Sequence, residues 1–234
     1  MNYKLLEACR ESGCPICRLE QQGVERYLDN QLYENVNSPA WREHLRGSHA
    51  FCHEHTWLSV NKRLGDALGF SIIYHDIVSS VLKELSGAQR SVSAPRRRGT
   101  LAGQFSEPLR IGIKRALAAL TPHKRCPVCE HRDQMTRDIL SALAEELLTP
   151  EMTEALQASE GLCLPHLKRA LGYLKDDTAY ESLLAIHSAK LESLKNELAE
   201  FIRKNDYQAI KEGFGKEGNA WLRAMGLIAG RRRE

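Results

Sequence analysis

A pattern of four metal-ligand residues occurs twice in this chain and constrains its fold more than any other sequence feature. The first copy joins C-P-I-C at 14–17 to C-H-E-H at 52–55, and the second joins C-P-V-C at 126–129 to C-L-P-H at 163–166. Three Cys and one His form a common tetrahedral zinc set, and a two-residue gap lets both members of a pair bind one ion. The sequence therefore predicts one metal site per copy. The expected ligands are Cys14, Cys17, Cys52 and His55 in the first site and Cys126, Cys129, Cys163 and His166 in the second.

The two copies keep their register along the chain. An offset of 112 residues carries the first C-P-x-C onto the second, and an offset of 111 carries C-x-x-H onto C-x-x-H. Such spacing, broken by one insertion or deletion, indicates a duplicated structural unit. Cysteines that only pack in a core, or a dithiol switch of the thioredoxin type, are the alternatives. Neither explains the distant C-x-x-H, and no strand–helix–strand pattern surrounds either C-P-x-C.

Helix starts are expected at the ligand pairs. Pro15 and Pro127 suit the first turn of a helix, which places each C-P-x-C at a helix N-terminus. The positive end of the helix dipole there favours thiolate and neutral imidazole, the protonation states that a metal needs.

Apolar residues recur at helical spacing, and no alternating strand pattern persists, so an all-helical fold is predicted. We expect two related lobes, each held by its own Cys3His site. The expected boundaries are a first metal-binding unit at 1–85, a basic flexible linker at 86–108, a second unit with a C-terminal helix at 109–230, and a basic tail at 231–234.

The net charge of +3 is unevenly distributed, because residues 86–125 hold nine basic side chains and one acidic one. Two arginine runs, Arg96, Arg97 and Arg98 and then Arg231, Arg232 and Arg233, are candidate contacts for nucleic acid. Neither run is accompanied by an aromatic platform, which favours a solvated linker and tail. A protein partner is the main expectation.

No apolar run approaches eighteen residues and the N-terminus lacks a secretory signal, so we expect no membrane association and a cytoplasmic location. In a reducing compartment, paired cysteines indicate metal ligands rather than disulfides.

The chain combines the C-P-x-C and G-x-C-x-x-H elements with D-Y-Q at 206–208 and E-G-N-A-W-L-R-A at 217–224. In these elements it resembles a bacterial and archaeal family known only as a domain of unknown function. The first copy departs from the glycine-led form, since it has Ala50 where the second has Gly161. The resemblance supports the ligand sets and the boundaries, and it implies no activity.

Zinc, two ions per chain, and an iron–sulfur cluster are the candidate cofactors. Cys9, Cys14 and Cys17 reproduce the C-x4-C-x2-C spacing of plant-type ferredoxins, with Cys52 as a fourth ligand. The second-copy counterpart of Cys9 is Thr121, so Cys9 is a bystander if the sites are equivalent.

Four protein ligands close a zinc site to a water nucleophile, and no nucleophile triad or nucleotide-binding loop is present, so an enzyme is not favoured. The predicted function is a non-enzymatic zinc protein that acts as an interaction or regulatory module. An iron–sulfur protein in electron transfer or redox sensing is the main alternative, and a thiol oxidoreductase is a third. His75 and His187 are expected to be helix histidines at packing surfaces, with a role near a metal as the alternative.

Overall fold

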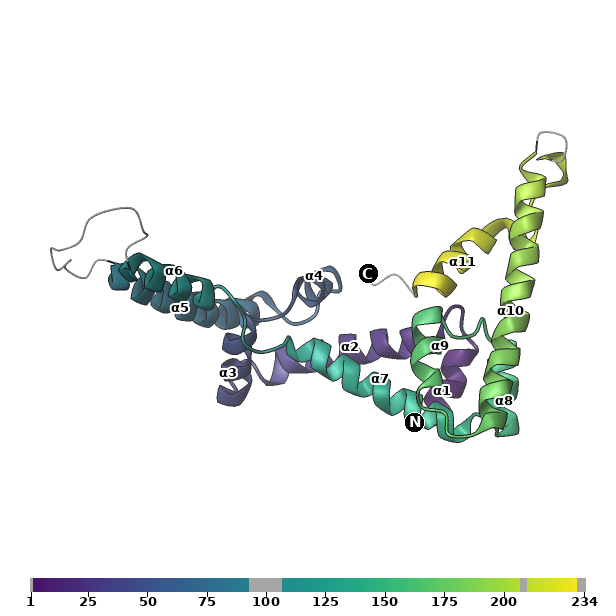
Figure 1. Ribbon diagram of the computed structural model, residues 1–234, viewed down its shortest axis with the longest axis horizontal. Helices are drawn as coiled ribbons and strands as arrows, with labels where there is room; N and C mark the ends of the chain where they lie inside the picture. Colours follow the sequence, from purple (N-terminus) through teal and green to yellow (C-terminus); the bar gives the residue numbers. More distant parts are fainter. Residues whose placement is uncertain (1, 93–106, 207–209, 231–234) are drawn as a thin grey trace. The chain divides into compact units, whose positions relative to one another are not determined.

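The computed structural model describes residues 2–92, 107–206 and 210–230, and the regular structure within them is helical throughout, which confirms the predicted fold class (Figure 1). The α-helices are α1 (Asn2–Cys9), α2 (Pro15–Glu34), α3 (Pro39–Ser48), α4 (His53–Asn61), α5 (Ala67–Val92), α6 (Glu107–Ala119), α7 (Pro127–Glu146), α8 (Pro150–Ala158), α9 (Leu164–Leu171), α10 (Asp177–Lys204) and α11 (Ala220–Ala229). Two short 3-10 helices, η1 (Ile210–Glu212) and η2 (Lys216–Asn219), precede α11.

The chain divides into two compact units. Residues 1–23 and 132–234 form one, here called the terminal unit, and residues 24–131 form the other, the central unit. The boundaries fall inside α2 and α7, so each of these helices contributes residues to both units. This division differs from the expected succession of a first and a second lobe.

The helix order after α1 and after α6 is the same. Helices α2 and α7 are each 20 residues long, and each is followed by two short helices and one long helix. This agreement is compatible with the duplication inferred from the sequence, which remains an interpretation.

Local sequence accounts for several helix starts. Ser38 and Thr149 precede the prolines that open α3 and α8, and their hydroxyls accept hydrogen bonds from the backbone N–H groups of Trp41 and Met152. Asp176 caps α10 in the same way, with its carboxylate 3.1 Å from the Ala179 nitrogen. These caps satisfy N–H groups that the first helical turn leaves without an intrahelical acceptor.

The terminal unit has its own apolar core, drawn from α1, the start of α2, the second part of α7, and α8 to α10. Its fully buried side chains include Leu5, Ile16, Leu140, Leu143, Leu147, Met152, Leu156 and Leu183. Cys14 and Cys163 belong to this core, so the first expected ligand pair lies beside the last one.

The central unit has a second core, formed by the later part of α2 together with α3, α5 and the start of α7. It includes Val24, Leu28, Leu32, Leu45, Phe51, Ile73, Ile77 and Val128. Helices α5 and α6 pair along their length (Figure 1).

Helices α5 and α6 both extend into the stretch 86–108 that the sequence predicts as a linker. Residues 86–92 continue α5 as far as Val92, and α6 starts at Glu107, so only residues 93–106 of that stretch lie outside the described part of the chain. The sequence has few bulky apolar residues after Leu85, but the small Ala88 in this part of α5 is buried.

Candidate metal sites

All eight expected ligands lie at helix starts. Cys14 and Cys126 directly precede α2 and α7, and Cys17 and Cys129 lie in their first turns. Cys52 and Cys163 are the N-cap residues of α4 and α9, with His55 and His166 one turn further on. One helical turn separates the members of each pair, so both side chains project from the same side of their helix.

The structure pairs the ligands differently from the sequence prediction. Cys14 and Cys17 gather with Cys163 and His166, and Cys52 and His55 gather with Cys126 and Cys129. The expectation that each half of the chain completes its own site is therefore wrong. We call the first group the terminal site and the second the central site, because each lies wholly within the unit of that name.

The physical reason for the crossed pairing lies in the packing of each unit. Cys14 and Ile16, at the start of α2, share one apolar core with Leu162 and Cys163. Val128, at the start of α7, belongs to the other core with Phe51. The apolar residues beside the cysteines thus bring together the first pair of one half and the second pair of the other.

The terminal site is compact. His166 Nδ1 lies 3.6, 3.3 and 3.1 Å from the sulfur atoms of Cys14, Cys17 and Cys163, respectively. The sulfurs of Cys17 and Cys163 are 3.7 Å apart. Three of the four ligands are buried, and Cys17 is half-buried.

The central site has nearly the same dimensions. His55 Nδ1 lies 3.2, 3.7 and 3.4 Å from the sulfur atoms of Cys52, Cys126 and Cys129. The sulfurs of Cys52 and Cys129 are 3.7 Å apart. In both sites all four donor atoms lie within 4.8 Å of one another.

These separations match the edges of one metal tetrahedron. With zinc–sulfur bonds of about 2.3 Å and zinc–nitrogen bonds of about 2.0 Å, tetrahedral geometry requires about 3.8 Å between sulfurs and about 3.5 Å between sulfur and nitrogen. The donor set and its geometry therefore fit a single tetrahedral ion at each site.

The electrostatics of the clustered thiols also favour a cation. Burial raises the pKa of Cys126, and hydrogen bonding to Cys163 and Cys17, with burial, raises the pKa of Cys14. Three crowded thiolates repel one another unless a positive charge lies between them. The helix N-termini that meet at each site supply part of that positive potential, and a divalent ion would supply the rest.

A buried carboxylate supports the terminal site. Glu20 Oε1 lies 3.1 Å from His166 Nε2, accepts a hydrogen bond from the Thr136 hydroxyl, and is 3.9 Å from Arg169 Nη1. Burial would raise the pKa of Glu20, but its hydrogen bonds to His166 and Thr136 outweigh burial and lower it. In the central site, His55 Nε2 lies 4.0 Å from Glu54 Oε1.

Sequence reasoning did not identify Glu20 or Thr136. Glu20 could have been found, because it follows Cys17 by three residues and so lies on the same face of α2. Thr136 lies in the middle of α7, and no local pattern marks it.

The other singled-out residues lie outside both clusters. Cys9 is buried in the terminal core, where burial raises its pKa to about 11. His187 Nε2 accepts a hydrogen bond from the Leu162 N–H at 2.8 Å, and its Nδ1 lies 2.8 Å from the Leu183 carbonyl. This is the structural role expected of a helix histidine at a packing surface. His75 is exposed on α5 and belongs to neither ligand group.

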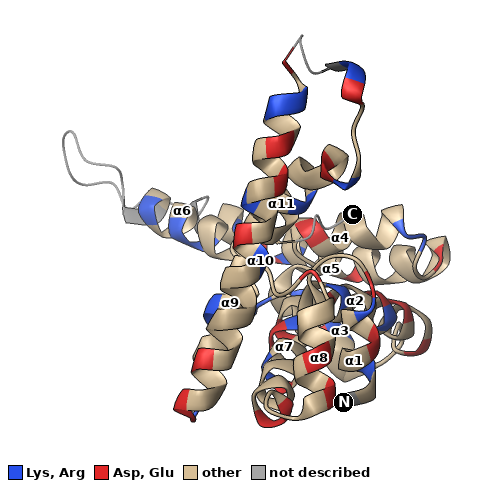
Figure 2. Cartoon of the chain, turned by 90° about the vertical axis from the view of Figure 1, so that its right-hand side faces the viewer, with Lys and Arg blue, Asp and Glu red and all other residues tan. Residues whose placement is uncertain are grey.

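Both arginine runs, 96–98 and 231–233, lie outside the described residues. Basic side chains nevertheless mark α6, which carries Arg110, Lys114 and Arg115 (Figure 2). None of the helices described here combines the length and the apolar character that crossing a bilayer requires.

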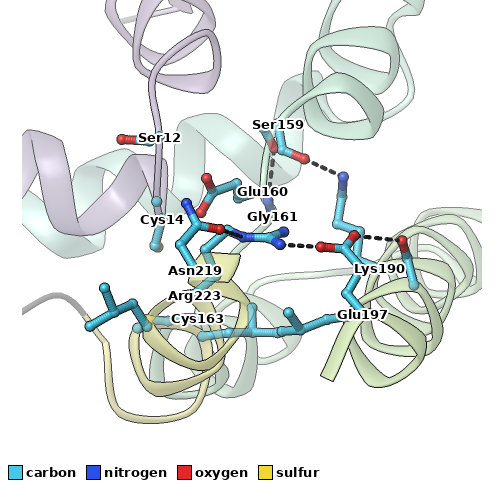
Figure 3. A pocket seen from close by; sticks show the side chains of 16 residues that line it. Ser12, Cys14, Ser159, Glu160, Gly161, Cys163, Lys190, Glu197, Asn219 and Arg223 are labelled. Atoms are coloured by element: carbon cyan, nitrogen blue, oxygen red, sulfur yellow. Dashed lines mark hydrogen bonds and ion pairs between the residues drawn. The ribbon is translucent and has the colours of Figure 1, made fainter. Parts of the chain in front are cut away.

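A cavity of about 490 Å³ adjoins the terminal site and is lined by Cys14, Cys163 and residues of α10 and α11 (Figure 3). Three of the charged side chains that line it, Lys190, Glu197 and Arg223, bind neighbouring protein atoms. Lys190 donates to the carbonyls of Gln157 and Ser159, and Arg223 pairs with Glu197 and donates to Asn219. These contacts join α10 to the loop before Cys163 and to α11.

Helical structure and two Cys3His clusters define an all-helical protein with two candidate metal sites. The chain belongs to the family of unknown function DUF6062, which matches residues 4–234. The family resemblance noted from the motifs is thereby confirmed.

The chain is also similar to an uncharacterized 23.9 kDa protein in the xynA 3' region of Caldicellulosiruptor sp. (strain Rt8B.4). The two sequences are 24% identical over 229 residues, which cover 97% of this chain and 99% of that protein. No solved structure matches the chain.

Proposed function

We propose that the chain binds two zinc ions, one at each site, and that both ions are structural. The observation that carries this proposal is the set of donor distances, which agree with the edges of a zinc tetrahedron in both sites. Each ion would join two helix starts that lie far apart in sequence. Cys17 and Cys163, for example, are separated by 146 residues.

The same distances favour a single ion over an iron–sulfur cluster. A cluster distributes its protein ligands over more than one iron, with sulfides between them, so some ligand atoms must stand farther apart than one tetrahedral edge. The donor set of one His and three Cys per site also suits zinc better than a cluster, which usually takes four Cys. Cys9, the extra cysteine of the ferredoxin-like spacing, belongs to neither ligand group.

Four protein ligands leave no open position for water, which supports a structural role over hydrolytic chemistry. A zinc-held helical scaffold without an open metal site is suited to presenting a surface to other molecules. Thiolate ligands persist in a reducing compartment, which supports the cytoplasm as the location.

We infer that the interaction surface includes the paired helices α5 and α6. Ile113, Leu117 and Leu120 follow helical spacing and are exposed, as are Val78 and Leu82 on α5. Arg110 and Lys114 lie beside them at helical spacing on α6. An apolar face bordered by basic side chains fits a protein partner whose own apolar face is bordered by acidic residues.

Metal analysis of anaerobically purified protein tests the metal assignment. Zinc at about two ions per chain in a colourless protein is expected for two closed Cys3His sites. Iron together with inorganic sulfide, and visible absorption that dithionite bleaches, would instead identify the iron–sulfur alternative.

Affinity capture tests the interaction surface. Proteins retained by the wild type and by the Tyr33→Ser control, but lost by the Leu117→Ser/Leu120→Ser variant, are the expected result. Tyr33 is exposed on α2 and serves as a matched exposed hydrophobic residue. Capture of the same proteins by all three forms would exclude the α5–α6 face.

A further inference from the structure

Glu20 is an acidic side chain buried at a place where burial needs a specific reason. It lies on α2 one turn after Cys17, and it is 6% exposed. An ionised carboxylate removed from water is costly unless hydrogen bonds and opposite charges replace its hydration. Three groups do so here: the His166 imidazole, the Thr136 hydroxyl and the Arg169 guanidinium.

The arrangement of His166 explains why the carboxylate lies there. The Nδ1 atom faces the three sulfurs, and the opposite nitrogen, Nε2, faces Glu20 Oε1 at 3.1 Å. A metal on Nδ1 requires the ring proton on Nε2, which then donates to Glu20. A hydrogen bond of this kind fixes the tautomer and the ring plane and makes the imidazole a stronger electron donor.

Thr136 and Arg169 hold Glu20 in turn. Thr136 lies on α7 and Arg169 on α9, so the carboxylate of α2 contacts two further helices of the terminal unit. Both Glu20 and Thr136 are buried, and Thr136 is fully so. Movement of the carboxylate away from His166 would therefore break contacts with α7 as well.

We infer that Glu20 is a positioning residue of the terminal site. Through its contact with His166, it raises the affinity of the site for its metal and slows the release of that metal. The inference rests on the proposed metal binding. Glu20 itself does not touch the metal, and Thr136 orients the Glu20 carboxylate.

The two sites in one chain provide an internal control. We would load wild type, Glu20→Gln, Glu20→Ala and Thr136→Val with zinc and measure release to excess chelator at neutral pH. One of the two ions is expected to leave about 10- to 100-fold faster in the Glu20 variants, because loss of a ligand's hydrogen-bonding partner typically weakens metal binding by that factor. The other ion keeps its wild-type rate, and Thr136→Val gives a smaller change in the same phase.

A spectroscopic readout separates positioning from general destabilisation. With 113Cd in place of zinc, wild type should give two resonances, and Glu20→Gln should shift one of them and leave the other in place. Glu34→Gln, an exposed carboxylate on the same helix, should shift neither. If Glu20→Ala does not fold, the isosteric Glu20→Gln carries the test.

The outcomes distinguish this inference from the proposed function. Wild type that binds no metal would overturn the proposed function and this inference with it. Wild type with two ions, and Glu20→Gln with unchanged release rates and unchanged resonances, would overturn the inference alone. Equal acceleration of both ions would also overturn it, since Glu20 would then act on the stability of the whole chain.

Discussion

Cys17 Sγ lies 3.7 Å from Cys163 Sγ, although 146 residues separate them. The corresponding contact of the other site joins Cys52 and Cys129 at the same distance. The C-P-x-C pair of each half therefore meets the C-x-x-H pair of the other half. This crossed arrangement determines which substitutions should remove which metal.

Stoichiometry in double variants tests the crossed pairing directly. Cys17→Ser/Cys163→Ser alters one site twice and should retain about one zinc per chain, whereas Cys17→Ser/Cys52→Ser alters both sites and should retain about none. If the ligands paired within each half, the first variant would retain about no zinc and the second about one zinc per chain. Zinc analysis after gel filtration, with circular dichroism to check that helices persist, distinguishes the two arrangements.

Metal removal should unfold much of the protein. Cys14 and Cys163 are part of the terminal core, and Cys126 is part of the central one. Structural zinc contributes roughly 10–16 kcal/mol in small peptides, which is as large as the total stability of about 5–15 kcal/mol of a typical domain. Far-ultraviolet circular dichroism during chelation should show a large loss of helix that zinc restores. Helix content that survives complete metal removal would contradict a structural role.

Gly161 and Ala50 occupy corresponding positions before Cys163 and Cys52, and both have positive φ, at 84° and 66°. Gly161→Ala should lower the free energy of unfolding by about 1–2 kcal/mol from backbone strain. The added Cβ would also lie 2.8 Å from Lys190 Cδ, which must then move.

The reciprocal Ala50→Gly relieves strain but increases the entropy of the unfolded chain, so it should change stability by less than about 1 kcal/mol. Urea denaturation of the zinc-loaded variants measures both. Equal losses from the two substitutions would show that the positive φ does not matter.

Glu217 lies in η2, directly before the C-terminal helix α11, and accepts a hydrogen bond from Lys204 at the end of α10. A hydrogen bond from Lys204, with backbone N–H groups including that of Gly215, lowers the pKa of Glu217 to about 2. A carboxylate with a lowered pKa contributes stability that is complete above its ordinary pKa of 4.5 and is lost as the pH falls from there toward about 2.

Glu217→Gln should therefore speed amide hydrogen exchange in α11 to the same extent at pH 7 and pH 6, and leave α8 unchanged. Exchange in α11 that matches the wild type at both pH values would show that the Lys204 pair does not secure this helix.

The sequence allowed the helical class and the eight clustered side chains to be predicted because both depend on local patterns. Periodic apolar residues specify helices, and a two-residue gap specifies a ligand pair. The way in which the pairs combine is not local. Cys14 and Cys17 are chemically as well suited to Cys52 and His55 as to Cys163 and His166. Because both copies offer the same ligand types, the sequence does not indicate which two pairs form one site.

The pairing is determined by packing contacts between residues that lie far apart in sequence. Ile16 lies in one core with Leu162, and Val128 lies in the other with Phe51. The contact between Glu20 and Thr136 could not be predicted for the same reason, since a carboxylate on α2 and a hydroxyl on α7 meet only once the terminal unit has formed.

The crossed arrangement also has a consequence for synthesis on the ribosome. The central site has all four of its ligands when Cys129 emerges. The terminal site, which includes Cys14 and Cys17, has all four only when His166 emerges. Because emerging segments fold in chain order, the thiols of Cys14 and Cys17 remain exposed to oxidants and competing cations longer than those of any other ligand cysteines. In a nascent chain arrested before residue 163, the central site would already be able to bind its ion, while Cys14 and Cys17 would still lack their two partner ligands.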